Sequence, residues 1–127
     1  DERVTNGDFS DGMTGWLAFS EGYYSVVDGK MIGTDIGLVD VYQNSVMEAG
    51  KNYIIFYACE TNKGTYELAD GFGVPLPNTE VNTSKGYLTV HRTPVNTETS
   101  VRFSAGSVLS DQNVIISSVS VKEIFEL

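Results

Sequence analysis

The chain has 127 residues, of which 41% are aliphatic, aromatic or cysteine, an ordinary share for one globular domain that argues against disorder. Its 8 Lys and Arg residues against 17 Asp and Glu residues give a formal net charge of −9, so a phosphate backbone would be repelled and nucleic acid is not an expected partner. No apolar run approaches the roughly 18 residues that span a bilayer, so membrane insertion is not expected.

The expected strands are short and regularly spaced. Runs rich in β-branched and aromatic residues alternate with Gly, Asn and Asp, and helix signals are nearly absent. The strands are predicted at 16–20, 22–27, 30–34, 38–44, 52–60, 64–69, 86–93, 99–105 and 114–124. Short strands with no helices between them predict an all-β fold, an antiparallel β-sandwich or jelly roll of about 8–10 strands.

The first stretch, residues 6–16, is expected to carry the chain across one end of the core. Its Asn-Gly pair at 6–7 and Asp-Gly pair at 11–12 are turn dipeptides, because Asn, Asp and Gly tolerate a positive φ angle. Phe9 and the only tryptophan, Trp16, are expected to anchor this polar loop in the core.

The strand 52–60 is expected to be the hydrophobic centre. Alternation gives it two apolar faces, one with Tyr53, Ile55, Tyr57 and Cys59 and the other with Ile54, Phe56 and Ala58. A strand of this kind lies in the middle of a sheet, and its second face is covered by a loop, a neighbouring subunit or a ligand. The sequence leaves these three alternatives open.

The last third of the chain begins with a region of unclear pattern. We interpret 70–86 as a long loop, the kind of segment through which β-sandwiches often meet partners. In the strand 99–105 the apolar residues alternate regularly, and Arg102 points outward. In the strand 114–124 the alternation of apolar and polar residues shifts by one position, which predicts a β-bulge near Ser117-Ser118.

Residue types that carry catalysis are scarce. His91 is the only histidine, so a metal site with two histidines cannot form within one chain. Cys59 is the only cysteine, and its apolar strand favours burial over a reactive pairing with His91. The sequence has no phosphate-binding glycine loop and no Gly-x-Ser-x-Gly elbow. We therefore predict that the protein is not an enzyme.

The motifs of the amino-terminal stretch carry a family resemblance. The Asn-Gly-Asp-Phe-Ser motif followed by Gly-Trp resembles the opening of galactose-binding-like jelly rolls, which include the family 4, 9 and 22 carbohydrate-binding modules and domains of phage tail-fibre and virion appendage proteins. Further matches in the family's order are Asp28-Gly29-Lys30, Gln43, Ala49-Gly50-Lys51-Asn52-Tyr53 and Val119-Ser120-Val121-Lys122-Glu123. The resemblance implies one jelly-roll domain over 1–127, as one module of a larger protein or assembly.

The resemblance also implies a possible calcium site, although the sequence requires no cofactor. Family members commonly hold a structural Ca²⁺ between the amino-terminal loop and an Asp of the final strand, and the ion takes about 6–8 oxygen ligands. In this chain the loop ligands would be Asn6, Asp8 and Asp11. Ser117 stands where the family often has Asp, and a hydroxyl is a poorer ligand for calcium. Turn and cap chemistry is the alternative role for the loop residues.

Sugar binding in the family uses aromatic rings and planar polar groups on the concave sheet or at loop tips. If the Leu and Val of strand 86–93 face inward, Tyr87 and His91 face outward beside Phe56. Tyr23 and Tyr66 are candidates to join this patch. Gln43 matches a family glutamine, and whether it binds the backbone or a ligand is left open. The candidate ligand-binding residues are therefore Phe56, Tyr87, His91, Tyr23, Tyr66 and Gln43.

The resemblance implies a non-catalytic module of a phage-type virion or tail-fibre appendage, located outside the cell or on the virion surface. It would serve attachment, including glycan recognition, or assembly, with a glycan, a protein, further copies of itself or other virion subunits as partners. The alternative is a carbohydrate-binding module of a secreted glycoside hydrolase. The compact chain, the missing Asp and the lack of an exposed tryptophan favour the appendage; an uncharacterised enzyme is the third hypothesis.

Overall fold

A computed structural model describes residues 2–18, 20–48, 50–69, 86–92, 100–105 and 109–124, with only the backbone at 69 and 86–92. The strands in these ranges are β1 (Leu17–Ala18), β2 (Tyr24–Val27), β3 (Lys30–Gly33), β4 (Val41–Gln43), β5 (Asn52–Thr61), β6 (Tyr66–Ala69), β7 (Gly86–Arg92), β8 (Val101–Ala105) and β9 (Val114–Ile124). In the described part of the chain there is no helix with the length and apolar character to cross a membrane.

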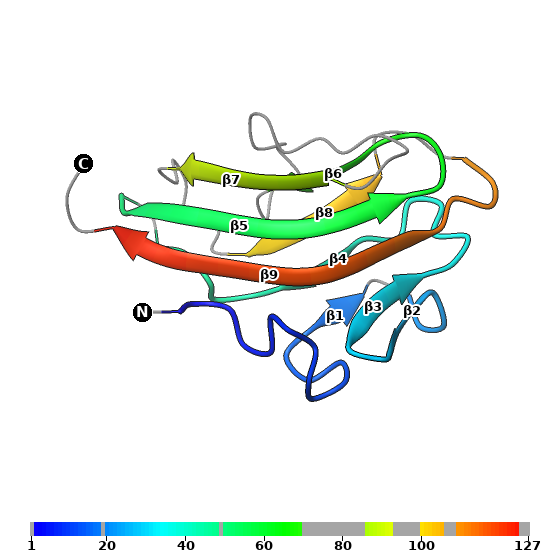
Figure 1. The fold of residues 1–127 in the computed structure, drawn as a ribbon, viewed down its shortest axis with the longest axis horizontal. Coiled ribbons are helices and arrows are strands. Elements are labelled where there is room, and N and C mark those ends of the chain that lie inside the picture. Colours follow the sequence, from blue (N-terminus) through cyan, green and yellow to red (C-terminus); the bar gives the residue numbers. More distant parts are fainter. Residues whose placement is uncertain are drawn as a thin grey trace.

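The strands form two antiparallel sheets that pack face to face (Figure 1). One has the order β1-β4-β8-β6 and the other the order β2-β3-β9-β5-β7, so neighbours in space are mostly distant in sequence. The predicted antiparallel β-sandwich is confirmed, and each predicted strand has a counterpart. The loop expected at 70–86 lies almost wholly outside the described residues.

Several strands are shorter than predicted, and for β1 and β4 a turn uses the backbone groups just before the strand. Trp16 donates its backbone N–H to the Met13 carbonyl over 2.8 Å, so β1 starts only at Leu17. Val39 likewise donates to the Ile36 carbonyl over 2.8 Å, and β4 starts two residues later than that turn. Turn hydrogen bonds of this kind compete with strand pairing and are invisible to residue alternation.

An aromatic cluster fills the space between the two sheets. The Phe103 ring is central, with ring centroids 6.4 Å from Trp16, 5.6 Å from Tyr57 and 5.8 Å from Tyr66. Phe9 extends the cluster, 5.7 Å from Trp16. Tilted, edge-on and offset arrangements at these distances are favourable for aromatic pairs. The predicted anchoring of the amino-terminal stretch by Phe9 and Trp16 is therefore confirmed.

The long strand β5 lies between β9 and β7, as expected of the hydrophobic centre. Its predicted inward side chains, Tyr53, Ile55, Tyr57 and Cys59, are all buried. On its second face Ala58 is buried and Phe56 is half-buried, while Ile54 stays 42% exposed. This second face is therefore covered only in part.

The predicted β-bulge lies in the β5–β9 ladder. Ala58 pairs with Ser118, and Cys59 pairs with Ile116, so Ser117 has no counterpart in the register. The extra residue shifts the phase of β9, which lets both Ile116 and Val119 reach the core. The bulge prediction is confirmed.

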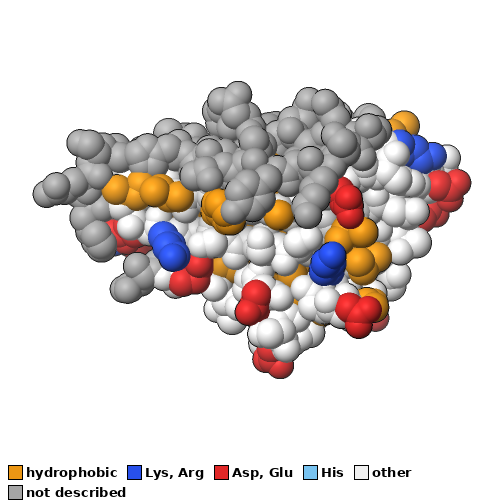
Figure 2. All heavy atoms as spheres, in the orientation of Figure 1, with side chains coloured by type: hydrophobic (Ala, Val, Ile, Leu, Met, Phe, Trp, Pro, Cys, Tyr) orange, Lys and Arg blue, Asp and Glu red, His pale blue; other side chains and the backbone are white. Residues whose placement is uncertain are grey.

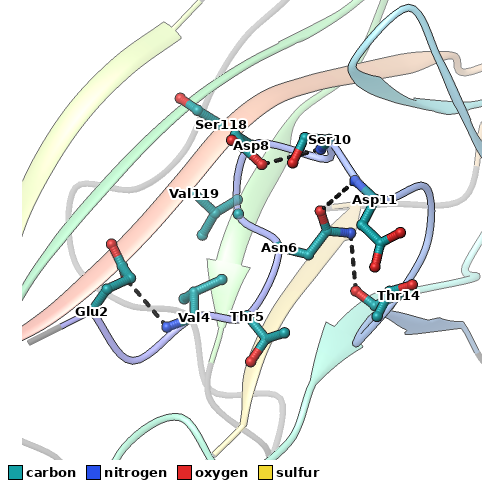
Figure 3. A pocket seen from close by; sticks show the side chains of 11 residues that line it. Glu2, Val4, Thr5, Asn6, Asp8, Ser10, Asp11, Thr14, Ser118 and Val119 are labelled. Carbon is teal, nitrogen blue, oxygen red and sulfur yellow. Dashed lines mark hydrogen bonds between the residues drawn. The ribbon is translucent and has the colours of Figure 1, made fainter.

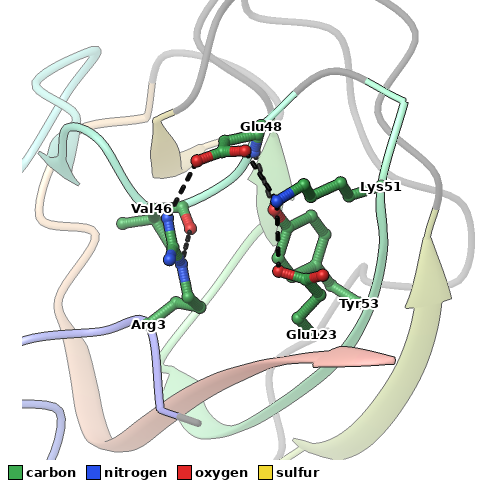
Figure 4. A network of polar contacts seen from close by, with 6 residues as sticks. All are labelled: Arg3, Val46, Glu48, Lys51, Tyr53 and Glu123. Carbon is green, nitrogen blue, oxygen red and sulfur yellow. Dashed lines mark hydrogen bonds and ion pairs between the residues drawn. The ribbon is translucent and has the colours of Figure 1, made fainter. Parts of the chain in front are cut away.

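The chain's first residues run beside β9 and are tied to the end of the sandwich. Arg3 donates its backbone N–H to the Val121 carbonyl over 2.7 Å and its Nε to the Val46 carbonyl over 3.0 Å. Nearby, the Lys51 ammonium lies 2.8 Å from Glu48 and 3.6 Å from Glu123 (Figure 4). Exposed ion pairs contribute little individually, so the backbone hydrogen bonds carry most of this connection.

Candidate functional site

The predicted calcium residues line a hollow of about 510 Å³ between the amino-terminal loop and β9 (Figure 3). The Asn6 Nδ2 donates to the carbonyls of Gly12 and Thr14, over 2.8 and 3.0 Å, and the Asn6 Oδ1 accepts from the Asp11 backbone N–H over 3.0 Å. Asp8 Oδ1 accepts from the Ser10 backbone N–H over 3.1 Å. These contacts close the loop on itself.

The donor set fits turn and cap chemistry better than a calcium site. The hydrogen bond from the Ser10 backbone lowers the pKa of Asp8, as expected of a capping carboxylate. Across the hollow, β9 contributes Ser118 and Val119 and no carboxylate. Among the residues that the structure describes, no group of three or more His, Cys, Asp or Glu side chains could hold a metal ion. Turn and cap chemistry predicts that chelation of calcium leaves the protein's stability unchanged, whereas a bound structural ion predicts a loss.

The predicted ligand patch maps to the outer face of the five-stranded sheet. Phe56 pairs in register with Ser120 on β9, while Ala58 and Ile54 pair with Tyr87 and His91 on β7. Residues paired directly opposite share a face of a sheet, so Phe56 and the positions of Tyr87 and His91 lie on the same face. Figure 2 shows hydrophobic side chains in separate groups along this side of the molecule.

Two of the candidate ligand residues are internal. Tyr66 is fully buried and its hydroxyl lies 2.9 Å from that of Tyr24, so its inclusion in a surface patch is wrong. The strand alternates with Glu67 outward, which turns Tyr66 toward the core. Gln43 is buried and bonds the backbone of Thr5 with both ends of its amide, over 2.7 and 2.8 Å. Of the two roles left open for Gln43, the structure shows the one in which it binds the backbone.

Tyr23 is 37% exposed but lies away from Phe56. It precedes the pair formed by Tyr24 and Gly33, and Gly33 pairs with Val114 at the start of β9. Phe56 instead pairs with Ser120, well along the same strand. The structure therefore does not bring Tyr23 into the patch.

The Cys59–His91 pairing has no support from the register. Cys59 pairs with Gly86 and His91 pairs with Ile54, so the two residues lie at opposite ends of the β5–β7 ladder. Cys59 is 1% exposed, and this burial raises the pKa of its thiol to about 12. A thiol of that pKa is almost entirely protonated at neutral pH and is a poor nucleophile.

A different arrangement lies on the outer face of the four-stranded sheet. Tyr42 pairs in register with Leu17 on β1 and with Arg102 on β8, and Leu17 is 49% exposed. The outward positions of this sheet, together with the adjoining Asp40 and Asn44, form the small-sheet face: Leu17, Asp40, Tyr42, Asn44, Glu67, Arg102 and Ser104.

Charged and aromatic groups meet at the centre of the small-sheet face. The Arg102 guanidinium carbon lies 5.7 Å from the centroid of the Tyr42 ring, within cation–π range. The Arg102 Nε lies 3.7 Å from Asp40 Oδ2, and the two side chains are only 19% and 15% exposed. Burial raises the pKa of Asp40 to about 6, although the Arg102 charge opposes the rise.

Polar groups flank this centre on both sides. Just past the end of β4, the Asn44 amide oxygen accepts a hydrogen bond from Ser100 Oγ over 2.7 Å. On the far side of Arg102 along β8, Ser104 pairs in register with Glu67 of β6. The face thus combines a ring, a guanidinium, an amide and two carboxylates, which can offer hydrogen bonds to hydroxyl groups and a π-surface to C–H groups.

Sequence reasoning predicted the outward direction of Arg102 but missed Tyr42 and Asp40 as site residues. A signal for Tyr42 was present, because it stands between inward Val41 and Gln43 in the strand predicted at 38–44. The Asp40–Arg102 contact had no signal, since it depends on the pairing of β4 with β8, which are far apart in the sequence.

No protein-family model matches the chain, and no curated protein matches its sequence. Solved structures match its fold. The amino-terminal cellulose-binding domain of Cellulomonas fimi β-1,4-glucanase C has a TM-score of 0.70 at 19% identity, covering 98% of each chain. A family 16 carbohydrate-binding module has a TM-score of 0.71 at 14% identity, covering 94% of this chain and 99% of that one.

A longer relative in fold is the Clostridium thermocellum endo-1,4-β-D-xylanase 10B, solved as its CBM22-1 and GH10 modules in complex with xylohexaose. Its TM-score is 0.67 at 13% identity, and the match covers 96% of this chain but 28% of that one. At such identities the likeness shows the fold. This chain has the jelly-roll fold of carbohydrate-binding modules, as the resemblance in its motifs implied.

Proposed function

We propose that the chain is a non-catalytic carbohydrate-binding module that binds a glycan along the small-sheet face. The observation that carries this proposal is the row formed by Leu17, Tyr42 and Arg102 across three neighbouring strands. Strands are about 4.8 Å apart, so a ligand crossing all four strands has a track of about 14 Å. That length suits an oligosaccharide better than a single sugar.

The chemistry of the face suits sugars in particular. A sugar ring offers C–H groups on its faces and hydroxyl groups around its rim, so it needs an apolar or aromatic surface flanked by polar groups. Leu17 and Tyr42 supply the first, and the Asn44 amide and the carboxylates supply the second. Rings and amides that are already held by neighbouring contacts lose little entropy when a ligand binds.

The names of proteins with this fold support the same class of ligand. They include a cellulose-binding domain and structures in complex with xylohexaose and with β-1,4-galactotriose. These names favour the carbohydrate-binding alternative over the virion appendage, for which no comparison gives support. On this proposal the protein works outside the cell as a binding module without catalytic activity.

The test is binding of the chain to neutral polysaccharides, measured by affinity electrophoresis and calorimetry on a panel of β-glucan, xylan and galactan. We expect at least one to bind and Tyr42→Ala to weaken it about tenfold or more, which corresponds to about 1.4 kcal/mol. Tyr23→Ala is the matched control, because it removes a partly exposed tyrosine that precedes β2 of the other sheet. It should leave the affinity unchanged.

Two results would overturn the proposal. One is the absence of binding to every polysaccharide of a broad glycan array by the folded chain. The other is binding that survives Tyr42→Ala and is lost in Phe56→Ala, which would move the site to the outer face of the five-stranded sheet.

A further inference from the structure

We propose that Asp40 is a positioning residue that holds the Arg102 guanidinium over the Tyr42 ring and neutralises it, so that the small-sheet face selects neutral over anionic glycans. The inference rests on the proposed function. It goes beyond that function by naming the property of the glycan that the face discriminates and the residue that sets it.

The three groups form one compact unit. Arg102 and Tyr42 are directly paired between β8 and β4, and Asp40 immediately precedes β4, two residues before Tyr42. The Asp40 Oδ2 is 3.7 Å from the Arg102 Nε, and the guanidinium carbon is 5.7 Å from the ring centroid. The guanidinium therefore lies close to both a carboxylate and an aromatic ring.

The charge of this unit decides which ligands it accepts. A guanidinium is charged at every physiological pH, and alone on a binding face it would attract carboxylate or sulfate groups through paired hydrogen bonds. With ionised Asp40 beside it, the unit has no net charge, and an arriving anion meets the repulsion of the carboxylate as well. Both side chains are largely shielded from solvent, so water screens these interactions only weakly.

This selectivity depends on pH, because Asp40 titrates in an accessible range. Burial raises the pKa of Asp40 to about 6, so the unit is neutral above that pH and becomes cationic below it. The other titratable groups near Asp40 in the described residues are the hydroxyls of Tyr24 on β2 and Tyr66 on β6. Burial raises the pKa of both, so they stay neutral throughout. Glu67 adds one carboxyl group to the same face.

The experiment compares one anionic ligand, polygalacturonate, with the neutral polysaccharide panel, for the wild-type chain and Asp40→Asn at fixed ionic strength. The uronate groups stay ionised above about pH 4, so a change with pH reports on the protein. We expect Asp40→Asn to gain on the order of tenfold in affinity for polygalacturonate relative to the neutral ligand at pH 7.5. The wild-type chain should make the same gain as the pH falls through about 6.

Two controls separate positioning from general charge. Asp28→Asn removes one negative charge from an exposed turn, and Asn accepts the positive φ of 52° at that position. It should leave the selectivity unchanged. Adding Arg102→Gln to Asp40→Asn should abolish the gain. The NMR signal of the Arg102 Nε–H should also move with a midpoint near pH 6 in the wild-type chain and stay fixed in Asp40→Asn.

The outcomes are distinct. If the wild-type chain binds a neutral glycan and Asp40→Asn has the same selectivity as wild type, or as Asp28→Asn, the inference is wrong while the proposed function stands. If the wild-type chain binds no glycan at any pH, both are wrong. A selectivity that shifts with pH equally in wild type and in Asp40→Asn would also overturn the role of Asp40.

Discussion

The hydroxyl group of Tyr66 lies 2.9 Å from the hydroxyl group of Tyr24, and this contact joins the two sheets through the core. Tyr24 belongs to β2 of one sheet and Tyr66 to β6 of the other. Tyr24 donates its only hydroxyl proton to the Val39 carbonyl over 2.8 Å, so Tyr66 is the donor between the two tyrosines. Tyr24 is thus the middle of a chain of two hydrogen bonds.

This order of donors and acceptors predicts that two similar substitutions reduce stability by different amounts. Tyr24→Phe removes both hydrogen bonds and leaves a buried hydroxyl and a carbonyl unpaired, so we expect a loss of about 1–3 kcal/mol in the free energy of unfolding. Tyr66→Phe removes one bond and leaves the other in place, for about 0.5–1.5 kcal/mol. Urea unfolding of the two variants checks the order. Equal losses, or a larger loss for Tyr66→Phe, would contradict the assignment of the donor.

Gly7 makes the closest approach of the amino-terminal loop to β9. Its carbonyl accepts from the Val119 backbone N–H over 2.9 Å, and a methyl group added at Gly7 would overlap the Val119 carbonyl oxygen. Backbone on both sides cannot shift cheaply, so Gly7→Ala should destabilise the fold by about 2 kcal/mol or more. Gly12→Asn is the control, since that position has open space and a positive φ that Asn tolerates. Thermal unfolding should show a clear loss for Gly7→Ala alone.

The fold was largely predictable because its determinants are local. Alternation in β8 and β5, turn residues between strands and the phase slip at Ser117 each depend on residues close together in the sequence. The predicted strands therefore agree with those of the structure. The exceptions were strand starts such as Leu17, because a turn hydrogen bond uses the backbone N–H of the residue before it, which is therefore not part of the strand.

The site was less predictable because its determinants are not local. Asp40 and Arg102 come together only through the pairing of β4 with β8, and no spacing in the sequence encodes that neighbour relationship. Tyr66 was misplaced because an aromatic strand residue is equally compatible with core and surface until its sheet face is known. Asn6 and Asp8 carried a motif that suits both metal binding and capping, and their hydrogen bonds distinguish these roles only in the folded loop.

The amino-terminal loop allows a direct test of calcium. The Asn6 amide holds three backbone groups of the loop, so Asn6→Asp should lower the free energy of unfolding by about 1–3 kcal/mol, because two donor bonds become carboxylate–carbonyl repulsions. We expect the wild-type melting temperature to be the same in millimolar calcium and in a chelator. A rise of several degrees with calcium, lost in Asp8→Ala or Asp11→Ala, would show that the loop residues bind the ion after all.

The outer face of the five-stranded sheet can be tested for association. Ile54 is 42% exposed, and Phe56 beside it is half-buried, so a second copy or another protein would gain apolar burial there. If this face is an interface between copies, light scattering should give a mass above the 13.8 kDa of one chain, and Phe56→Asp should reduce it to that value. Glycan binding on the small-sheet face should be unaffected. A wild-type chain that stays monomeric at high concentration would exclude self-association through Phe56.

The charge of Asp40 predicts how stability changes with pH. Its pKa rises on folding from the ordinary value of 3.8 to about 6, because burial disfavours the carboxylate more than Arg102 favours it. Asp40 therefore stabilises the fold relative to an ordinary carboxyl group when it is protonated. This contribution is fully present below pH 3.8 and is lost as the pH rises through about 6. Asp40→Asn cannot ionise, so between pH 4 and pH 8 the wild-type chain should lose about 1–3 kcal/mol relative to the variant. Chemical unfolding of both chains across that range measures the difference. A constant difference would mean that Asp40 ionises in the fold as it does in water, and a wild-type chain that gains stability relative to the variant as the pH rises would mean that Arg102 outweighs burial.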